Sequence, residues 1–224
     1  MELWLVSGLV VLLVLGLLFW RGPFRRPRPE SERPAEPPQA QPALSEAKPG
    51  DVVFVAGGRD HLVEAVLDCQ EEVGGRLTRW QWLVLSEGWL IELLPYHRYL
   101  GQQWQVVYQG TPLFDALVGP GGALRRFEAH VREGIAAQEP VILTIEGTSW
   151  RVSSTGSFQA SARGEVWPQG PVWAALSPDP ADNVYFTLSR TEGAEERVLG
   201  LWTDHILLYR ERPLAEGDAT LYPR

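Results

Sequence analysis

The side chains best suited to acid–base or metal chemistry in this chain are four histidines: His61, His97, His130 and His205. Local zinc motifs use His-x-His, His-x-x-x-His or Cys-x-x-Cys spacing, and the sequence contains none of them. Two of the histidines directly follow an aspartate, in Asp60-His61 and Asp204-His205. Adjacent side chains of a strand point to opposite faces, so neither aspartate can orient its own histidine. We therefore predict no catalytic and no metal-ligating residue from these motifs.

Motifs for nucleophilic catalysis and for phosphate binding are also incomplete. The sequence STGS at 154–157 lacks the Gly-x-Ser-x-Gly pattern of a strand–elbow–helix nucleophile. The glycines within 119–122 lack the Gly-Lys-Ser/Thr that completes a P-loop and the third glycine of a dinucleotide fingerprint. The sequence therefore predicts no cofactor and favours a protein that is not an enzyme. A hydrolase-like enzyme, with a site assembled across the fold from scattered residues such as His61 and His205, is the alternative.

Tryptophans are concentrated in the stretch TRWQWLVLSEGWLIELLP, residues 78–95. Glu87-Gly88 separates two apolar runs and predicts a β-hairpin with a two-residue loop. Side chains alternate between the faces of a strand, so in that register one face carries Trp80, Trp82, Val84, Ile91 and Leu93. The other face carries Gln81, Leu83, Leu85, Leu90, Glu92 and Leu94. Because both faces are largely apolar, we expect the hairpin inside a sandwich or a barrel.

Two of these tryptophans, Trp80 and Trp82, share a predicted face with aliphatic side chains. Aromatic side chains dominate core burial in β domains, so this arrangement favours a place in the core. The alternative is an aromatic-lined groove for a small ligand, built on Trp80, Trp82 or Trp104.

Short apolar runs separated by Gly, Pro, Asp and Asn recur along the rest of the chain. They predict strands at 52–55, 62–69, 104–109, 171–177, 183–190, 197–202 and 205–211, and a hairpin over 141–154 around Glu146-Gly147. Residues 121–138 are predicted as a helix with Leu124, Phe127, Val131 and Ile135 on one face. The fold class is therefore mainly β, with a β-sandwich or barrel-like domain. A faint similarity between 50–110 and 139–212 also suggests two repeated β modules.

The N-terminal segment 1–21 is predicted to be a transmembrane anchor. Leu3 to Trp20 is eighteen residues without a charge, about 27 Å of helix. Trp4 and Trp20 stand at its ends, where aromatic belts lie in membrane proteins. No positive region precedes the run, which disfavours the alternative of a cleaved signal peptide. We expect this helix to contact membrane lipids.

Arginines predict the orientation of this anchor. Arg21, Arg25, Arg26 and Arg28 follow the apolar run, and none precedes it. The positive-inside rule then places the N-terminus outside and the rest of the chain in the cytoplasm. The same arginines could contact anionic lipid head groups, although a topology signal alone explains them.

A linker and a folded domain follow the anchor. Residues 22–49 hold eight prolines and are predicted to be a disordered linker, reaching about 85 Å in polyproline II. Residues 50–224 form one β-rich domain. Its single cysteine, Cys69, excludes an intramolecular disulfide. Beyond residue 49 there are 14 arginines and 23 acidic residues, a net charge of −9, which excludes the basic surface of a nucleic-acid-binding protein.

The chain resembles the bacterial family catalogued as domain of unknown function 4178 over about residues 50 to 210. The resemblance rests on Gly50-Asp51, on the aromatic strand before WLIELL, on ILTIEGTSWRV and on VLGLWTDHILLY. It implies a small β-rich domain, often with a membrane segment, and it supplies no functional residues. We expect a membrane-anchored cytoplasmic β domain that binds a protein partner, as an adaptor or a sensor.

Overall fold

The computed structural model describes residues 43–118, 124–164, 183–191, 196–202 and 205–224. They belong to one compact unit, Gln41–Arg224. Among them there is no helix whose length and apolar character would let it cross a membrane. The predicted anchor at 1–21 lies outside the described residues, and so do its membrane-interface residues Trp4, Trp20, Arg21, Arg25, Arg26 and Arg28.

The described part of the chain is mainly β, as predicted. Its strands are β1 (Val52–Val55), β2 (Asp60–Val73), β3 (Arg76–Leu85), β4 (Trp89–Leu93), β5 (Arg98–Val107), β6 (Ile142–Ile145), β7 (Thr148–Ser157), β8 (Gln159–Gly164), β9 (Val184–Arg190), β10 (Arg197–Trp202), β11 (Ile206–Pro213) and β12 (Ala219–Tyr222). The α-helices are α2 (Pro112–Val118) and α3 (Leu124–Ala137). Two 3₁₀ turns, η1 (Leu44–Glu46) and η2 (Ser86–Gly88), complete the described elements.

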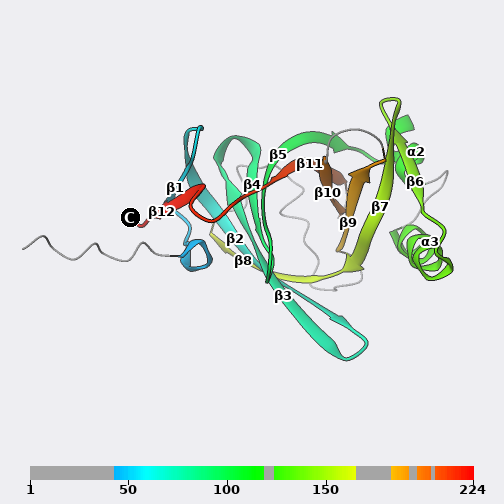
Figure 1. Ribbon diagram of the computed structural model, residues 1–224, viewed down its shortest axis with the longest axis horizontal. Coiled ribbons are helices and arrows are strands. Elements are labelled where there is room, and N and C mark those ends of the chain that lie inside the picture. Colours follow the sequence, from blue (N-terminus) through cyan, green and yellow to red (C-terminus); the bar gives the residue numbers. More distant parts are fainter. Residues whose placement is uncertain (1–42, 119–123, 165–182, 192–195, 203–204) are drawn as a thin grey trace, which may run out of the picture. The chain divides into compact units, whose positions relative to one another are not determined.

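The sheet closes into a barrel because the continuous segment β7–β8 pairs with β9 through its first strand and with β2 through its second. Neighbouring strands follow the order β12-β1-β2-β3-β4-β5-β11-β10-β9-β7-β6. Phe158 alone separates β7 from β8, and β7 pairs with β9 whereas β8 pairs with β2. The ring therefore runs from β2 through β5, β11 and β9 and returns along β7–β8 to β2 (Figure 1).

The two halves of the chain contribute their strands in matching order. Strands β1 to β5 form one antiparallel meander, and β6, β7, β9, β10 and β11 form a second. The halves meet where β5 pairs with β11 and where β2 pairs with β8. The strand predicted at 171–177 lies outside the described residues.

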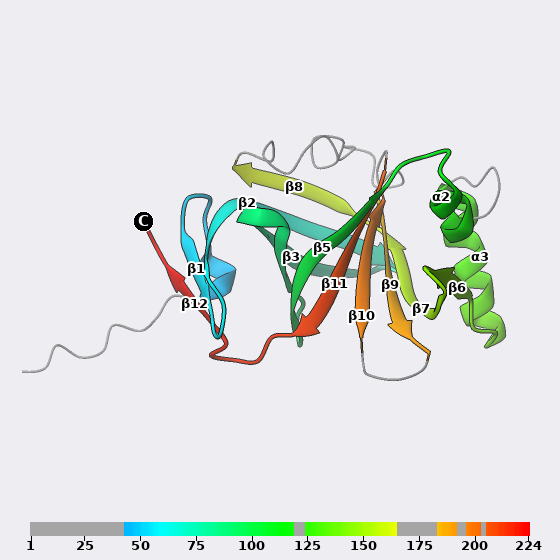
Figure 2. The same ribbon diagram turned by 90° about the horizontal axis from the view of Figure 1, so that it is seen from above.

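Apolar side chains fill the barrel and cover two parts of its outer wall. The interior cluster includes Leu67, Trp82, Phe158, Leu199 and Tyr209. A second cluster joins α2 and α3 to the outer face of β7, β9, β10 and β11, and a third joins β1, β12 and η1 to the outer face of β2 to β5. The helices and the β1–β12 pair thus cover opposite sides of the barrel (Figure 1 and Figure 2).

The β3–β4 hairpin differs by one residue from the predicted register. Leu85 pairs with Trp89, so the loop has the three residues Ser86–Gly88 and not two. Glu87 and Gly88 both take positive φ angles, 62° and 75°. The prediction of a two-residue loop is therefore wrong, because the sequence Ser-Glu-Gly forms a 3₁₀ turn that takes in Ser86.

A slip of one residue moves every side chain of the second strand to the other face. Trp82 pairs with Glu92, and Leu90 and Glu92 share the interior with it. The predicted position of Ile91 and Leu93 beside Trp82 is wrong, since Ile91 belongs to the cluster on the outer wall.

Most other predicted elements are confirmed. The strands expected at 52–55, 62–69, 183–190, 197–202 and 205–211 coincide with or lie largely within β1, β2, β9, β10 and β11, and the 141–154 hairpin is β6–β7. The strand expected at 104–109 is the last part of β5. The predicted helix is α3, with Phe127 and Val131 buried. Helix α2 and strands β8 and β12 were not predicted, and Leu44 and Ala47 of the predicted linker are buried in the domain.

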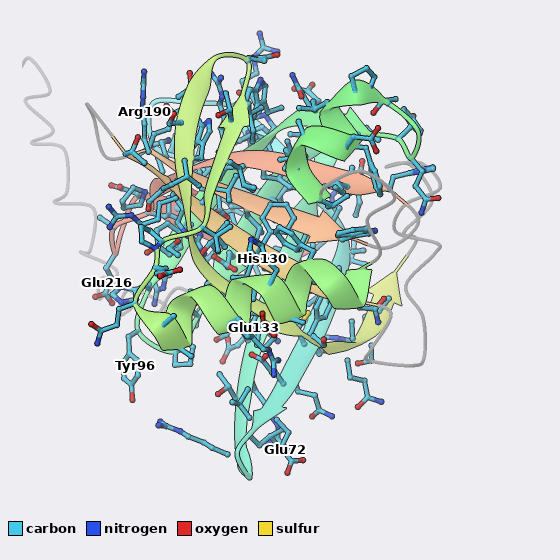
Figure 3. The ribbon with its side chains drawn as sticks, turned by 90° about the vertical axis from the view of Figure 1, so that its right-hand side faces the viewer. Glu72, Tyr96, His130, Glu133, Arg190 and Glu216 are labelled. Atoms are coloured by element: carbon cyan, nitrogen blue, oxygen red, sulfur yellow. The ribbon has the colours of Figure 1, made fainter. Side chains whose placement is uncertain are left out.

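The hairpin of β2 and β3 projects beyond the rest of the barrel (Figure 1). Glu72 lies near its end (Figure 3). The turn residues Gly74 and Gly75 both have positive φ, 58° and 79°. Val73 and Leu77, on either side of the turn, are exposed.

Candidate functional site

The structure places the four histidines in separate surroundings. His61 is buried at the start of β2 against the Trp89 ring, 5.4 Å between centroids. His205 lies before β11 and contacts Tyr108 with ring centroids 4.5 Å apart. His97 contacts Tyr99, and His130 is exposed on α3 (Figure 3). Within the described residues no group of three or more His, Cys, Asp and Glu side chains could hold a metal ion.

Trp80 and Trp82 belong to the core, as predicted. Trp82 is fully buried and Trp80 is 7% exposed. Their rings pack edge to face at 5.7 Å, and Phe158 lies 5.0 Å from Trp82. Trp104 is only partly buried, between the Trp150 ring and the Arg210 guanidinium.

A charged cluster at the interior was not predicted. Arg197 donates a hydrogen bond of 2.6 Å to Oε2 of Glu92 and a second one to Oε2 of Glu211. Its guanidinium also stacks on the Tyr99 ring at 4.0 Å. Glu92 and Glu211 are 3% and 5% exposed, so this is a buried pair of carboxylates that share one guanidinium.

The charges of this cluster are unequal, with two carboxylates for one cation. Burial raises the pKa of Glu211 well above its ordinary value, the Glu92 carboxylate raises it further, and Arg197 opposes both effects. Burial lowers the pKa of Arg197, but Glu211 and Glu92 outweigh this and the net change is upward. Oε1 of Glu211 is buried and has no hydrogen-bond partner among the described atoms. Burial and the second carboxylate therefore favour the protonated form of Glu211, and Arg197 favours its charged form.

The largest described hollow lies elsewhere, on the outer wall. It is a groove of about 650 Å³ over strands β8, β2, β3, β4 and β5. Its floor follows one row of directly paired residues: Ser161 opposite Asp68, Asp68 opposite Gln81, Gln81 opposite Leu93, and Leu93 opposite Arg98. A second, shorter row of Gln159, Gln70 and Arg79 lies beside it. We call this hollow the cross-strand groove.

The floor of the cross-strand groove is held in place by hydrogen bonds around Asp68. Arg163 donates to both carboxylate oxygens, Nε to Oδ2 at 2.9 Å and Nη2 to Oδ1 at 3.2 Å. Gln81 donates from Nε2 to Oδ1 at 2.7 Å. In the neighbouring row, the Gln70 amide donates to the Gln159 carbonyl oxygen at 2.8 Å. Fixed amide and carboxylate groups on three strands make this a pre-formed polar floor.

The walls of the groove are apolar, unlike its floor. They are lined by Leu44 at the start of η1 and by Leu94 and Pro95, which directly follow β4. The two arginines in the groove, Arg79 and Arg98, make no ion pair with any described carboxylate. The described part of the groove thus offers apolar walls, a polar floor and two guanidinium groups without a described carboxylate partner.

Sequence reasoning missed the groove because its residues come from five strands and form no local motif. A signal was present in β2 and β3, where Asp68, Gln70, Arg79 and Gln81 alternate with buried side chains. Such alternation indicates a polar outer face, but only the strand pairing shows that these faces adjoin.

Comparison of the chain with protein-family models, with curated proteins and with solved structures found no match. The resemblance to domain of unknown function 4178 therefore stays a prediction, and the fold and the groove carry the functional argument.

Proposed function

We propose that this chain is a single-pass membrane protein whose β-barrel domain lies in the cytoplasm and works by binding a protein partner, as an adaptor or a sensor. The uncharged run at 3–20 and the four arginines that follow it support the anchor and its orientation. The anchor contacts lipids, and the linker gives the domain reach. Tethering raises the effective concentration of the domain for partners in the same membrane.

The cross-strand groove is the observation that carries the binding role. Side chains fill the interior of the barrel, with Trp82, Phe158 and Tyr209 at most 1% exposed, so the barrel is a packed core. The main concavity lies on its outer wall, and its floor is a row of five residues across five strands. At about 4.8 Å between strands this row is about 19 Å long, which an extended segment of about six residues would cover.

Capture of the full-length protein from native membranes, followed by mass spectrometry, tests this proposal. The chain with Ser161→Trp should lose the partner, because Ser161 is exposed on the groove floor and an indole would fill the groove. The matched control is Glu216→Trp, which places the same side chain at an exposed position outside the groove (Figure 3).

A parallel capture with residues 41–224 separates the domain from the anchor. This unit has its own apolar clusters, so it should retain the partner. A partner held only by the full-length chain would move the interface to the anchor or the linker. A partner that survives Ser161→Trp would contradict the groove as the binding surface.

A further inference from the structure

We infer that the cross-strand groove recognises an extended acidic segment of a protein, with carboxylate side chains on Arg79 and Arg98. This inference deepens the proposed function and rests on it, since it names the chemistry of the partner at the same groove.

The first argument is charge. The domain beyond residue 49 has a net charge of −9, so most of its surface repels an acidic ligand. The groove differs, because the one carboxylate among its described lining residues, Asp68, is paired with Arg163 through two hydrogen bonds. The other charged side chains described in the groove are Arg79 and Arg98. Arg79 is exposed, and neither arginine has a carboxylate partner among the described residues. Guanidinium groups bind carboxylates through paired hydrogen bonds.

The second argument is spacing. Arg79 lies on β3 and Arg98 on β5, two strands apart, and Arg79 is two residues along β3 from Gln81, whose row contains Arg98. Offsets of about 10 Å across the sheet and about 7 Å along it place their Cα atoms about 12 Å apart. Residues of an extended peptide rise about 3.3 Å each and point to alternate faces, so carboxylates four residues apart lie on one face, about 13 Å apart, and match this separation. Leu93, Leu94 and Pro95 lie on β4 and just after it, between the strands of the two arginines. An apolar residue between the two acids would contact them.

The floor favours a polypeptide over an anionic lipid head group. The amides of Gln70, Gln81 and Gln159 lie in two adjacent rows along the groove. Amide side chains can both donate to and accept from the backbone of an extended segment. A lipid head group offers phosphate oxygens at one point and no row of backbone groups.

The test uses the full-length protein in nanodiscs of neutral lipid and two labelled peptides, one of repeating Glu-Ser-Leu-Ser and one of repeating Lys-Ser-Leu-Ser, which place the charges and the leucines on one face of an extended chain. Fluorescence anisotropy should show binding of the Glu peptide and at least about tenfold weaker binding of the Lys peptide. Arg79→Gln with Arg98→Gln should weaken the Glu peptide about tenfold or more. Both arginines are on the surface of the groove, so thermal unfolding should be unchanged.

The matched control is Arg151→Gln with Arg212→Gln, which makes the same change in net charge at exposed positions outside the groove. It should leave the affinity for the Glu peptide within about twofold. Equal affinity for the two peptides, no binding of the Glu peptide, or an equal loss in both double variants would overturn the inference. Displacement of the Glu peptide by anionic vesicles, with vesicle binding lost in Arg79→Gln/Arg98→Gln, would assign the groove to lipid instead.

The two proposals can fail separately. A partner captured by the wild type and by Arg79→Gln/Arg98→Gln alike would keep the adaptor role and overturn the acidic ligand. A Glu peptide that binds as described, with no membrane partner captured, would keep the acidic ligand and overturn the adaptor role.

Discussion

The indole nitrogen of Trp82 donates a hydrogen bond of 3.2 Å to Oε1 of Glu92, the residue directly opposite it on the neighbouring strand. Both side chains are buried, at 0% and 3% exposure. Oε2 of the same carboxylate accepts from Arg197. A tryptophan of the apolar interior therefore donates a hydrogen bond to one carboxylate of the buried ion cluster.

Replacing Trp82 by Phe should lower the free energy of unfolding by about 1–3 kcal/mol more than replacing Trp80 by Phe. Trp80 is the matched control, because its indole nitrogen is buried without a hydrogen-bond partner among the described atoms. Trp82→Phe leaves a buried carboxylate oxygen without its donor, whereas Trp80→Phe makes the same change of ring size without breaking a hydrogen bond among the described atoms. Urea denaturation of both variants measures the difference, and equal losses would show that the hydrogen bond contributes nothing.

Glu211 should make the domain less stable as the pH rises. Burial, followed by Glu92, raises the pKa of Glu211 in the folded protein above the ordinary value of 4.5. The folded state therefore holds a proton that the unfolded chain releases, and stability falls as the pH rises from 4.5 through the folded-state pKa.

Glu211→Gln replaces the titrating carboxyl group with an amide that does not titrate, and so removes this pH dependence. Within that pH window the unfolding free energy of the variant should gain on that of the wild type by about 1.4 kcal/mol for each pH unit. Denaturation midpoints over a pH series provide the measurement, with exposed Glu216→Gln as the control. A constant difference between variant and wild type across the series would refute the assigned direction.

Gly200 should not tolerate a methyl group. A Cβ atom at this position in β10 would lie 2.1–2.5 Å from three ring carbons of Phe186, its direct partner on β9. Overpacking of this kind costs about 1–3 kcal/mol, so Gly200→Ala should lower the thermal midpoint. The same change in a Phe186→Leu background should cost less, because the ring is gone; an unchanged cost in this double-mutant cycle would contradict the steric cause.

Cys69 should be unreactive in the folded protein. Its thiol is 3% exposed, and burial, with smaller contributions from Asp68 and Glu92, raises its pKa well above 9.0. Because the thiolate is the reactive form, a thiol reagent at neutral pH should react only as the domain opens. Thr78→Cys, on the exposed end of β3, should react at once and serves as the control. Fast reaction of the wild-type chain would show that the Cys69 thiol is accessible and would contradict its burial.

Residue pattern alone was enough for most strands and for α3, because alternation and helical spacing are local properties. The side chains of β4 were predicted on the wrong faces because the loop before this strand has one residue more than expected. For the same reason Glu92 was not predicted to lie opposite Trp82. Local sequence patterns could not predict the ion cluster, since Glu92, Arg197 and Glu211 come from three different strands. The cross-strand groove could not be predicted either, because its floor needs the pairing of five strands. The expected duplication of β modules stays a prediction, although the two halves have matching strand order.

The barrel cannot close until the second half of the chain supplies β8 and β11, which pair with β2 and β5. Asp68 and Arg163, which pair across the closing strands, are separated by 95 residues, and β5 must find β11 at a similar distance. Contacts of such long range slow folding, because the loop between the strands must close before they pair. A chain emerging from the ribosome would hold β1 to β5 with one face of the future core unprotected until β11 is made. We expect a high contact order to make this domain a slow folder that depends on chaperones during synthesis.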